Sequence, residues 1–305
     1  MNSRSYLLLS FITFLLIIPA ITEVSAVDQV SVKEEKIQSD DVTLFVRTAG
    51  NPAKAPVLIA INGGPGQSSH YMKTLEQLAG PELTVVTFDQ RGTGRSTASA
   101  RGYDLLEYVA DIEAIRKHLR AKKIYLFGHS FGGILAQRYA SVHPKQVLSL
   151  ILMGSGPPKF TAIGMAQMKL GQRIQQLIKQ GIISGPRPTE PAKILEYMLP
   201  AYFSNPKFPI PEELRQSSFH PAVSQKTYSD SGNWDFSLEE KAITCPVLFL
   251  WGEDDPFGME MAEVSKSALV SADLRFVILK KCGHYWHENI KDFFSHIREF
   301  LKKKK

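Results

Sequence analysis

The segment Lys123–Gly133 reads Lys-Ile-Tyr-Leu-Phe-Gly-His-Ser-Phe-Gly-Gly, an apolar run that leads directly into a serine framed by glycines. Residues 124–127 are good strand formers, and residues 134–140, which follow, are good helix formers. A strand that turns sharply into a helix holds the serine in a strained conformation above the sheet edge. Only glycine fits where the neighbouring chain approaches this closely. The segment therefore predicts a strand–turn–helix unit with Ser130 as a nucleophile, the alternative being a glycine-rich turn with an idle serine.

Apolar runs of strand length and helix-like segments alternate on both sides of this unit. The runs are continuous, as in strands that are buried on both faces. The alternation predicts an α/β class, with a mostly parallel sheet covered by helices on both faces. With 305 residues, the chain is long enough for one such core with an insertion. We expect strands at 56–61, 83–88, 147–153, 247–251 and 275–280, a hairpin at 30–48, and helices at 67–80, 104–119, 259–270 and 290–301.

The alternation stops between residues 157 and 240, which are rich in proline and hold amphipathic helical pieces at 165–178 and 192–199. We therefore expect one α/β core made of residues 27–156 and 241–305. Residues 157–240 would form a helical cap over the carboxyl ends of the strands, the edge at which such sheets bind ligands. Most aromatic residues of the cap are expected to form a small core, with one or two lining a pocket: Tyr197, Tyr202, Phe203, Phe208, Phe219 and Trp234.

A serine attacks at neutral pH only with a base beside it, and the base needs a group that fixes its tautomer. Asp255 follows the strand expected at 247–251, and His284 follows the strand expected at 275–280. Parallel strands end at the same edge of a sheet, so both residues are predicted to lie near Ser130. The chain order Ser, Asp, His fits a nucleophile at a strand-to-helix turn.

Neighbouring residues leave alternatives open. Asp254 could replace Asp255, although the spacing from the strand favours Asp255. His287 could be the base in place of His284, but we expect a partly exposed histidine at the start of a helix. A metal site made of His284 and His287 lacks further ligands at suitable spacing, so no metal is predicted. His129 is expected to pack as a structural residue.

Two further loops carry a family resemblance. Residues 62–66 read Asn-Gly-Gly-Pro-Gly, and residues 89–96 read Asp-Gln-Arg-Gly-Thr-Gly-Arg-Ser. The chain resembles the α/β-hydrolase superfamily over essentially its whole length after residue 26. The two loops resemble those of the proline iminopeptidase group, which show His-Gly-Gly-Pro-Gly and Asp-Gln-Arg-Gly-x-Gly-x-Ser. The resemblance implies an α/β-hydrolase fold, no cofactor, and these roles: Ser130 as nucleophile, Asp255 as triad acid, His284 as base, and the backbone N–H groups of Gly64 and Phe131 as the oxyanion hole.

The resemblance implies a serine hydrolase that cleaves small amide or ester substrates, or short peptides, through an acyl-enzyme. An amino-terminal exopeptidase of the proline iminopeptidase type is the first hypothesis, a carboxylesterase or lactonase is the alternative, and a catalytically inactive binding protein is the third. The alternatives rest on three departures from the group. Asn62 replaces a histidine, the sequence around Ser130 is spelled as in esterases and lipases, and Pro256 stands where some members have a glutamate that holds the substrate's amine.

An exopeptidase must hold the charged amine of its substrate, and a partly desolvated amine needs a carboxylate partner. Proline cannot supply one, so the partner would come from the cap. Glu196 has tyrosines nearby in the sequence, and we expect it and Trp234 to contact the substrate. The other candidate carboxylates in the cap are Glu212, Glu213 and Asp230. The loop with Asp89 and residues 91–95 is expected to be tied to the neighbouring strands by a satisfied charge network.

The amino terminus has the layout of a secretory signal peptide. Arg4 precedes an apolar run at 6–18, and residues 24–26 are small enough for a cleavage site after Ala26. We expect a periplasmic or secreted protein with no membrane insertion once the signal is removed. A membrane anchor is the alternative, although the run is shorter than the about 20 residues that span a bilayer.

Charge and cysteine content limit the partners and the redox chemistry. Four of the six net positive charges come from residues 302–305, and no basic stripe interleaved with aromatic residues is present, so nucleic acid is not an expected partner. The oligomeric state is left open. Cys245 precedes one expected strand and Cys282 follows the next, so the two thiols would lie at opposite ends of the sheet. We predict two free, mostly buried thiols, because a disulfide needs Cα atoms within about 7 Å.

Overall fold

The structure is a computed structural model that describes residues 30–302. The predicted signal peptide, its cleavage after Ala26 and the last three lysines lie outside the described residues. Within residues 30–302, no helix combines the length and the apolar character needed to cross a bilayer.

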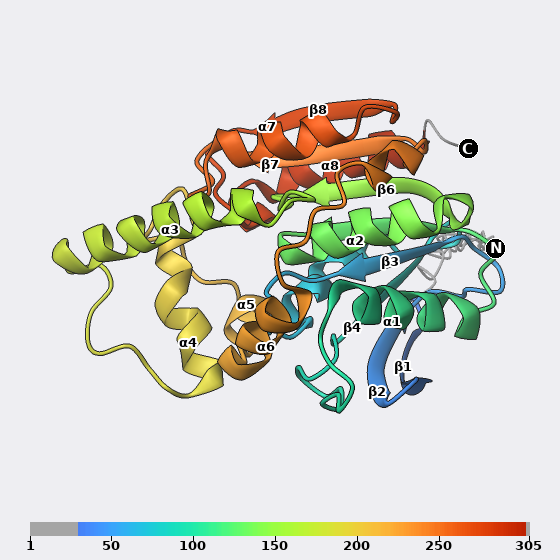
Figure 1. Cartoon of the computed structure of the whole chain (residues 1–305), viewed down its shortest axis with the longest axis horizontal. Helices are drawn as coiled ribbons and strands as arrows, with labels where there is room; N and C mark the ends of the chain where they lie inside the picture. Colours follow the sequence, from blue (N-terminus) through green and yellow to red (C-terminus); the bar gives the residue numbers. More distant parts are fainter. Residues whose placement is uncertain (1–29, 303–305) are drawn as a thin grey trace, which may run out of the picture.

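The strands of the described chain form one sheet of eight, in the order β1-β2-β4-β3-β5-β6-β7-β8 (Figure 1). The strands β1 and β2 form an antiparallel hairpin, and β2 also pairs antiparallel with β4. All other pairs of neighbouring strands are parallel. The strands β3, β4, β5 and β7 are buried along their whole length, which explains their largely continuous apolar sequences. The strands are β1 Val32–Ser39, β2 Val42–Ala49, β3 Val57–Ile61, β4 Thr84–Phe88, β5 Ile124–His129, β6 Val147–Met153, β7 Val247–Gly252 and β8 Leu274–Leu279.

Helices cover both faces of the sheet. Alternate residues of β3 face the two sides: Ile59 belongs to the apolar cluster that contains residues of α1, α2 and α7, whereas Leu58 belongs to the cluster that contains residues of η1 and α8. The prediction of a mostly parallel sheet covered on both faces is thus confirmed. The helices of these two layers are α1 Leu105–His118, α2 Phe131–Val142, α7 Met259–Ala268, the 3-10 helix η1 His70–Leu78, and α8 Ile290–Lys302; short 3-10 turns are η2 Pro144–Gln146, η3 Leu199–Ala201, η4 Glu239–Ala242 and η5 Trp286–Asn289.

One expected helix differs in type. Residues 67–80 were expected to form a single helix, but they contain a 3-10 helix that begins only at His70. Tyr71, Met72 and Leu75 are all 0% exposed and pack against the sheet. This tertiary packing overrides the local helix propensity.

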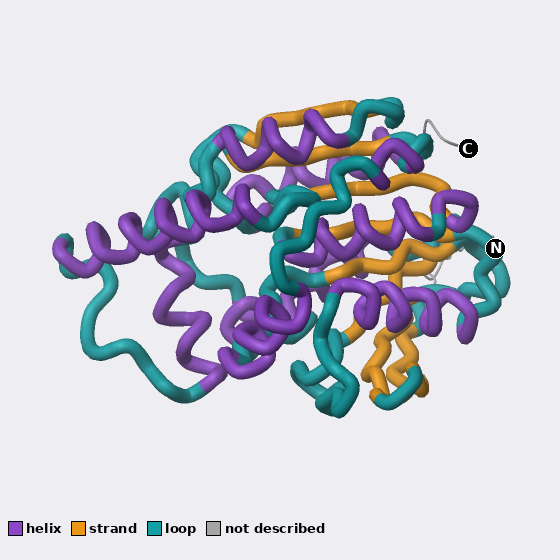
Figure 2. Tube along the Cα trace, in the orientation of Figure 1, coloured by secondary structure: helices purple, strands orange, loops and turns teal. Residues whose placement is uncertain are grey.

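Four helices lie together beyond one end of the sheet in Figure 1, within the range predicted for the cap. They are α3 Thr161–Lys179, α4 Pro191–Met198, α5 Glu212–Arg215 and α6 Pro221–Ser231. Leu170, Leu177, Ile183 and Ala201 form a small apolar core of their own. Figure 2 shows the long loop of residues 180–190 that joins α3 to α4 at the outer edge of this group.

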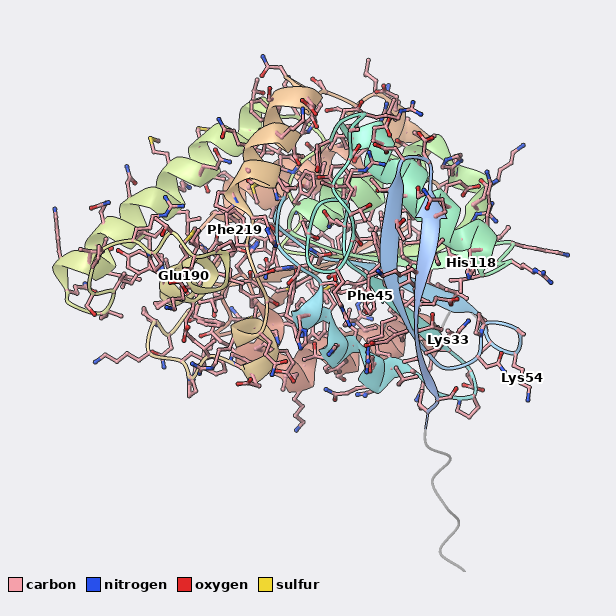
Figure 3. All side chains as sticks on the ribbon, turned by 90° about the horizontal axis from the view of Figure 1, so that it is seen from below. Lys33, Phe45, Lys54, His118, Glu190 and Phe219 are labelled. Carbon is pink, nitrogen blue, oxygen red and sulfur yellow. The ribbon has the colours of Figure 1, made fainter. Side chains whose placement is uncertain are left out.

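One ion pair lies buried inside the molecule, unlike the charged side chains at its surface. Lys33, Lys54 and Glu190 project from the surface in Figure 3. Arg91, by contrast, is fully buried, and its Nε and Nη2 donate to the two carboxylate oxygens of Asp111 at 2.8 and 2.9 Å. The expected charge network of this loop is present, but Arg91 ties the loop to α1 and not to a strand, whereas Arg95 pairs with Glu34 of β1 at 3.3 Å.

The two cysteines are free, as predicted. Cys245 precedes β7 and is half-buried, whereas Cys282 follows β8 and is fully buried. Neighbouring parallel strands place them at opposite ends of the sheet, so the prediction of two free, mostly buried thiols is confirmed.

A buried carboxyl group stands out in η4, which packs against α2. Glu240 is 0% exposed, and neither of its carboxylate oxygens has a hydrogen-bond partner among the described residues. Burial raises the pKa of Glu240 from 4.5 to about 8. The folded protein therefore holds this group in its neutral form at neutral pH.

We predict that Glu240 makes the stability fall as the pH rises. In the unfolded chain its carboxyl loses the proton near pH 4.5, whereas the folded protein retains it to about pH 8. Between these values the unfolded state binds fewer protons than the folded state, so the free energy of unfolding decreases. Glu240→Gln cannot ionise and should lack this part of the pH dependence.

Urea unfolding of both proteins across this pH range measures the effect. Glu239→Gln is the matched control, because the side chain of Glu239 is 52% exposed at the protein surface. The same pH dependence in the wild type and in Glu240→Gln would show that the assignment is wrong.

Candidate active site

Ser130 lies at the turn between β5 and α2, with φ 56° and ψ −121°. A residue other than glycine adopts a positive φ at a cost, and such strain is found mainly at functional sites. The turn is so tight that a Cβ on Gly132 would collide with the carbonyl groups of Ile61 and Asn62. At Gly128, a Cβ would lie 2.5 Å from the Gly132 carbonyl oxygen. The glycines thus let β5 and α2 pass close to β3 and present the Ser130 hydroxyl at the sheet edge.

His284 and Asp255 come together at the same edge, on the loops that follow β8 and β7. The Nδ1–H of His284 donates to Oδ2 of Asp255 at 2.7 Å. Both residues are buried, with 2% and 6% exposure. A carboxylate at Nδ1 keeps the proton on that nitrogen and leaves Nε2 able to accept one.

Ser130 and His284 line the same cavity. Within residues 30–302, no hydrogen bond joins the Ser130 hydroxyl to the His284 ring. Such bonds are commonly long in free enzymes and shorten with bound substrate, so the geometry is compatible with proton transfer between the two groups.

The neighbouring acidic residues connect the histidine loop to the cap. Asp254, the alternative to Asp255, accepts from the Ser204 hydroxyl at 2.6 Å and does not contact His284 through a hydrogen bond. Glu288 accepts from the backbone N–H groups of Gly283, Ser204 and Asn205 at 2.7–2.8 Å. We call this set of three hydrogen bonds the Glu288 clamp, and it fixes the histidine loop to residues 204–205 of the cap.

His287 differs from its expected environment. It was expected to be partly exposed, but it is 8% exposed and its ring stacks on Trp286 at 5.1 Å between centroids. Neither ring nitrogen has a partner among the described residues, and burial lowers the pKa of His287 to about 4. The η5 turn buries the ring in the core beside Trp286, and His287 does not line the cavity.

Gly64 and Phe131 line the cavity together with Ser130. Gly64 has φ +132°, and a Cβ there would lie 2.8 Å from the Gly66 nitrogen, so the loop requires glycine. Within the described chain, neither the Gly64 nor the Phe131 backbone N–H donates a hydrogen bond. Phe131 opens α2, whose dipole favours an anion at this end. The two amides can therefore stabilise a negatively charged oxygen.

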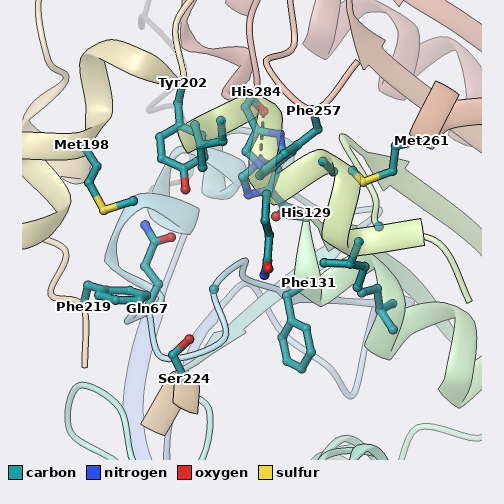
Figure 4. A pocket seen from close by; sticks show the side chains of 18 of the residues that line it. Gln67, His129, Phe131, Met198, Tyr202, Phe219, Ser224, Phe257, Met261 and His284 are labelled. Atoms are coloured by element: carbon teal, nitrogen blue, oxygen red, sulfur yellow. Dashed lines mark hydrogen bonds between the residues drawn. The ribbon is translucent and has the colours of Figure 1, made fainter. Parts of the chain in front are cut away.

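The cavity above Ser130 has a volume of about 220 Å³. Figure 4 shows Met198, Tyr202 and Phe219 of the cap on one side of it, and His284 and Phe257 on another. Among residues 30–302, no aspartate or glutamate lines this cavity. The lining residues are Gly64, Gln67, His129, Ser130, Phe131, Ile134, Gly156, Ile163, Ala166, Gln167, Leu170, Leu195, Met198, Tyr202, Phe219, Ser224, Tyr228, Phe257, Met261, His284 and Tyr285.

The two residues expected to contact substrate lie outside this wall. Glu196 points away to the surface and accepts from Nη1 of Arg215 at 2.8 Å. Trp234 is buried behind the wall, where it stacks on Tyr228 at 6.2 Å between centroids. The α4 helix turns its apolar side, with Leu195 and Met198, to the cavity, and Glu196 therefore faces outward. The other candidate carboxylates, Glu212, Glu213 and Asp230, also lie outside the wall.

Several residues of the wall had no signal in the sequence. Gln67 follows the glycine-rich loop and accepts from the Tyr285 hydroxyl at 3.1 Å. Phe257 packs edge-on against the His284 ring at 4.7 Å between centroids. Of the six cap aromatics named from the sequence, Tyr202 and Phe219 line the cavity; Tyr228, which is not among those six, lines it as well.

One group of carboxylates in residues 30–302 has the spacing to hold a cation: Asp40, Asp41 and Glu107. It lies at the hairpin turn and the start of α1, where Arg101 pairs with Asp40 and Glu107. None of these residues lines the cavity. The chemistry at Ser130 therefore has no connection with this group.

Comparisons with known proteins agree with this fold. Residues 56–289 match the family described as alpha/beta hydrolase fold. A proline iminopeptidase of Lactobacillus helveticus is 25% identical over 280 residues, which cover 84% of this chain and 93% of that protein. The resemblance that the two glycine-containing loops indicate is thus confirmed.

Solved structures show the same fold. A proline iminopeptidase of Mycobacterium smegmatis superposes with a TM-score of 0.67 at 20% identity, covering 89% of this chain and 98% of that one. A putative lipase from Acinetobacter baumannii superposes with a TM-score of 0.66 at 23% identity, covering 90% and 92%. A proline iminopeptidase and a putative lipase thus share this fold.

We predict that a fluorophosphonate probe labels Ser130. Ser130→Ala should keep the fold and lose the labelling, because the modified oxygen is gone. His284→Ala should slow labelling at least about 100-fold, the usual contribution of a general base. Intact mass spectrometry over time measures both effects.

His287→Ala is the matched histidine control and should be labelled at the wild-type rate, since His287 does not line the cavity. Equal loss of labelling in the two histidine variants, or labelling of folded Ser130→Ala, would contradict the assignment.

Proposed function

The chain belongs to the α/β-hydrolase family, and we propose that it is a serine hydrolase that transfers the acyl group of its substrate to Ser130 and then to water. Three features of the site support this: the exposed turn at Ser130, the His284–Asp255 hydrogen bond, and the two free amides of Gly64 and Phe131. The reaction needs no group beyond these residues and water.

In the first step, Nε2 of His284 takes the proton of the Ser130 hydroxyl as its oxygen attacks the substrate carbonyl carbon. Asp255 stabilises the positive charge that forms on the ring. The carbonyl oxygen becomes negative and accepts from the Gly64 and Phe131 N–H groups. His284 then gives its proton to the leaving group, and the acyl group remains on Ser130. Water repeats the sequence and releases the acid.

We propose that the substrate carries an uncharged, mainly apolar acyl group and is most simply an ester. The absence of a carboxylate from the cavity wall, within the described chain, carries this proposal. A charged amine placed there would lose its hydration without gaining a partner, which is costly. The volume of about 220 Å³ is also below the roughly 300–1,000 Å³ of pockets for drug-sized ligands, so the acyl group is small.

An amino-terminal exopeptidase of the proline iminopeptidase type is the second candidate. It is favoured by the relative from Lactobacillus helveticus, which aligns over 84% of this chain. This activity would require a carboxylate for the substrate's amine that the wall of the described cavity does not provide. The two candidates therefore differ in one property, the effect of a free amine on cleavage.

Three substrates with coloured leaving groups distinguish the candidates: the p-nitrophenyl ester of butyrate, which releases p-nitrophenol, and the prolyl and N-acetylprolyl p-nitroanilides, which both release p-nitroaniline. We predict the highest kcat/KM for the ester, and no advantage of the free amine over the acetylated one. Release of the coloured leaving group measures each rate. Cleavage of prolyl nitroanilide that acetylation abolishes would favour the exopeptidase, and no cleavage of any ester or amide would contradict the hydrolase proposal.

We also propose that residues 1–26 direct export, as the pattern of a charged residue, an apolar run and a small-residue site indicates. The exported protein is then expected to begin near Val27, with the residues of the active site unaffected. Amino-terminal sequencing identifies the first residue of the exported protein. An exported protein that keeps the apolar run at 6–18 would favour a membrane anchor instead.

A further inference from the structure

The histidine next to the nucleophile has two hydrogen-bond partners, and neither is a reacting group. His129 is 0% exposed and lies beside the His284 ring, at 4.7 Å between centroids (Figure 4). Its Nδ1 lies 2.7 Å from the Tyr71 hydroxyl, and its Nε2 lies 3.0 Å from the backbone carbonyl oxygen of His284. The same Tyr71 hydroxyl oxygen lies 2.6 Å from the backbone nitrogen of Gly63.

Only one arrangement of protons satisfies these contacts. A carbonyl oxygen only accepts, so Nε2 of His129 carries a hydrogen and donates to His284. Burial lowers the pKa of His129 well below its ordinary value, so the ring is neutral and Nδ1 accepts. The Tyr71 hydroxyl must therefore donate to Nδ1, which leaves its oxygen to accept from the Gly63 N–H. The direction runs from Gly63 through Tyr71 and His129 to His284.

This chain of hydrogen bonds joins two loops that come from distant strands. Gly63 follows β3. It directly precedes Gly64, which lines the cavity. His284 follows β8, which is four strands away from β3 in the sheet. Ser130 lies between them, and a Cβ on Gly63 would lie only 3.0 Å from its Cβ. A shift of either loop would change the distance from the nucleophile to the base or to the oxyanion donor.

We propose that Tyr71 and His129 are positioning residues that hold the Gly64 amide and the His284 ring in place on either side of Ser130. The proposal rests on the proposed function, in which these two groups act on the substrate. Errors of about 1 Å in such groups reduce rates by up to about 100-fold, so the chain of hydrogen bonds matters for turnover more than for binding.

Two other contacts limit the size of the effect. The Tyr285 hydroxyl donates to Gln67 at 3.1 Å and joins the same two loops a second time. The Tyr71 ring also packs edge-on against Tyr285 at 5.5 Å between centroids, a contact that phenylalanine would keep. Removing the Tyr71 hydroxyl alone therefore loosens the site without removing its core.

Tyr71→Phe is the first test, with Tyr139→Phe as its matched control. Tyr139 is also 0% exposed, and its hydroxyl donates to Glu113 at 2.8 Å, away from the cavity. Tyr71→Phe loses two hydrogen bonds of its hydroxyl and Tyr139→Phe loses one, so the stability of each variant is measured beside its rate. We expect Tyr71→Phe to lower kcat on the butyrate ester about 10- to 100-fold with a smaller change in KM, and Tyr139→Phe to keep the wild-type kcat.

Two substitutions of His129 each remove one of its two hydrogen bonds and keep the other. In His129→Asn, the amide reaches the Nδ1 position and can still accept from Tyr71, but the bond to His284 is lost. In His129→Gln, the amide reaches the Nε2 position and can still donate to His284, but the bond from Tyr71 is lost. We expect each to lower kcat, and His129→Ala, which breaks both links, to lower it further.

The tautomer of His129 is measured without turnover, by nitrogen NMR of protein labelled at histidine. We expect a proton on Nε2 and none on Nδ1, and a shift of the Nδ1 signal in Tyr71→Phe but not in Tyr139→Phe. A proton on Nδ1, or a kcat of folded Tyr71→Phe equal to that of folded Tyr139→Phe, would overturn the proposal.

Failure of the proposed function has a different signature. The wild-type protein would then neither hydrolyse the panel of substrates nor accept the fluorophosphonate. The NMR measurement on the same sample still decides whether the hydrogen-bond chain has the direction given above.

Discussion

The close passage of the chain past itself at Ser130 is the constraint on which the active edge of the sheet depends. The Ser130 N–H donates to the Met153 carbonyl of β6, and its carbonyl accepts from the N–H groups of Gly133 and Gly156. On the other side, Gly132 lies against the carbonyl groups at the end of β3. The nucleophile is thus fixed to the two strands that flank β5. The strain of a positive φ at Ser130 persists because the packing on both sides over-determines the turn.

The rest of the site consists of loops that leave the same sheet edge, and their contacts set its chemistry. The parallel sheet brings Asp255 and His284 to this edge, and hydrogen bonds then fix how each loop lies. The cap supplies a wall that is apolar apart from a few neutral hydrogen-bonding groups. Since relatives with this fold include proline iminopeptidases and a putative lipase, the fold alone does not set the substrate. The substrate class proposed above rests on the wall of the cavity.

The sequence was most informative where local chemistry allows only one solution. The turn at Ser130 and the buried strands follow from glycine spacing and from continuous apolar runs, and both are seen in the structure. The spacing from the end of the preceding strand explains why Asp255 could be chosen over Asp254. The sequence was least informative about which way a side chain faces. Glu196 faces outward because the side of α4 with Leu195 and Met198 lies against the cavity, and which side of a cap helix meets the cavity is set by the tertiary packing. His287 is buried by an aromatic neighbour in a short 3-10 turn, which no periodicity indicates.

The Glu288 clamp joins the cap and the loop of His284 into one structural unit. Glu288 holds the backbone of Gly283, Ser204 and Asn205 together, and the Tyr202 carbonyl accepts from the His284 N–H at 2.7 Å. Residues 202–205 of the cap are therefore part of the scaffold that orients the histidine, although they come from the segment that shapes the pocket. Exchange of the whole cap for that of another hydrolase, a common route to new selectivity, would remove the support of the histidine together with the pocket wall. A graft that keeps residues 199–205 and replaces only α3 and α4 would separate the two tasks.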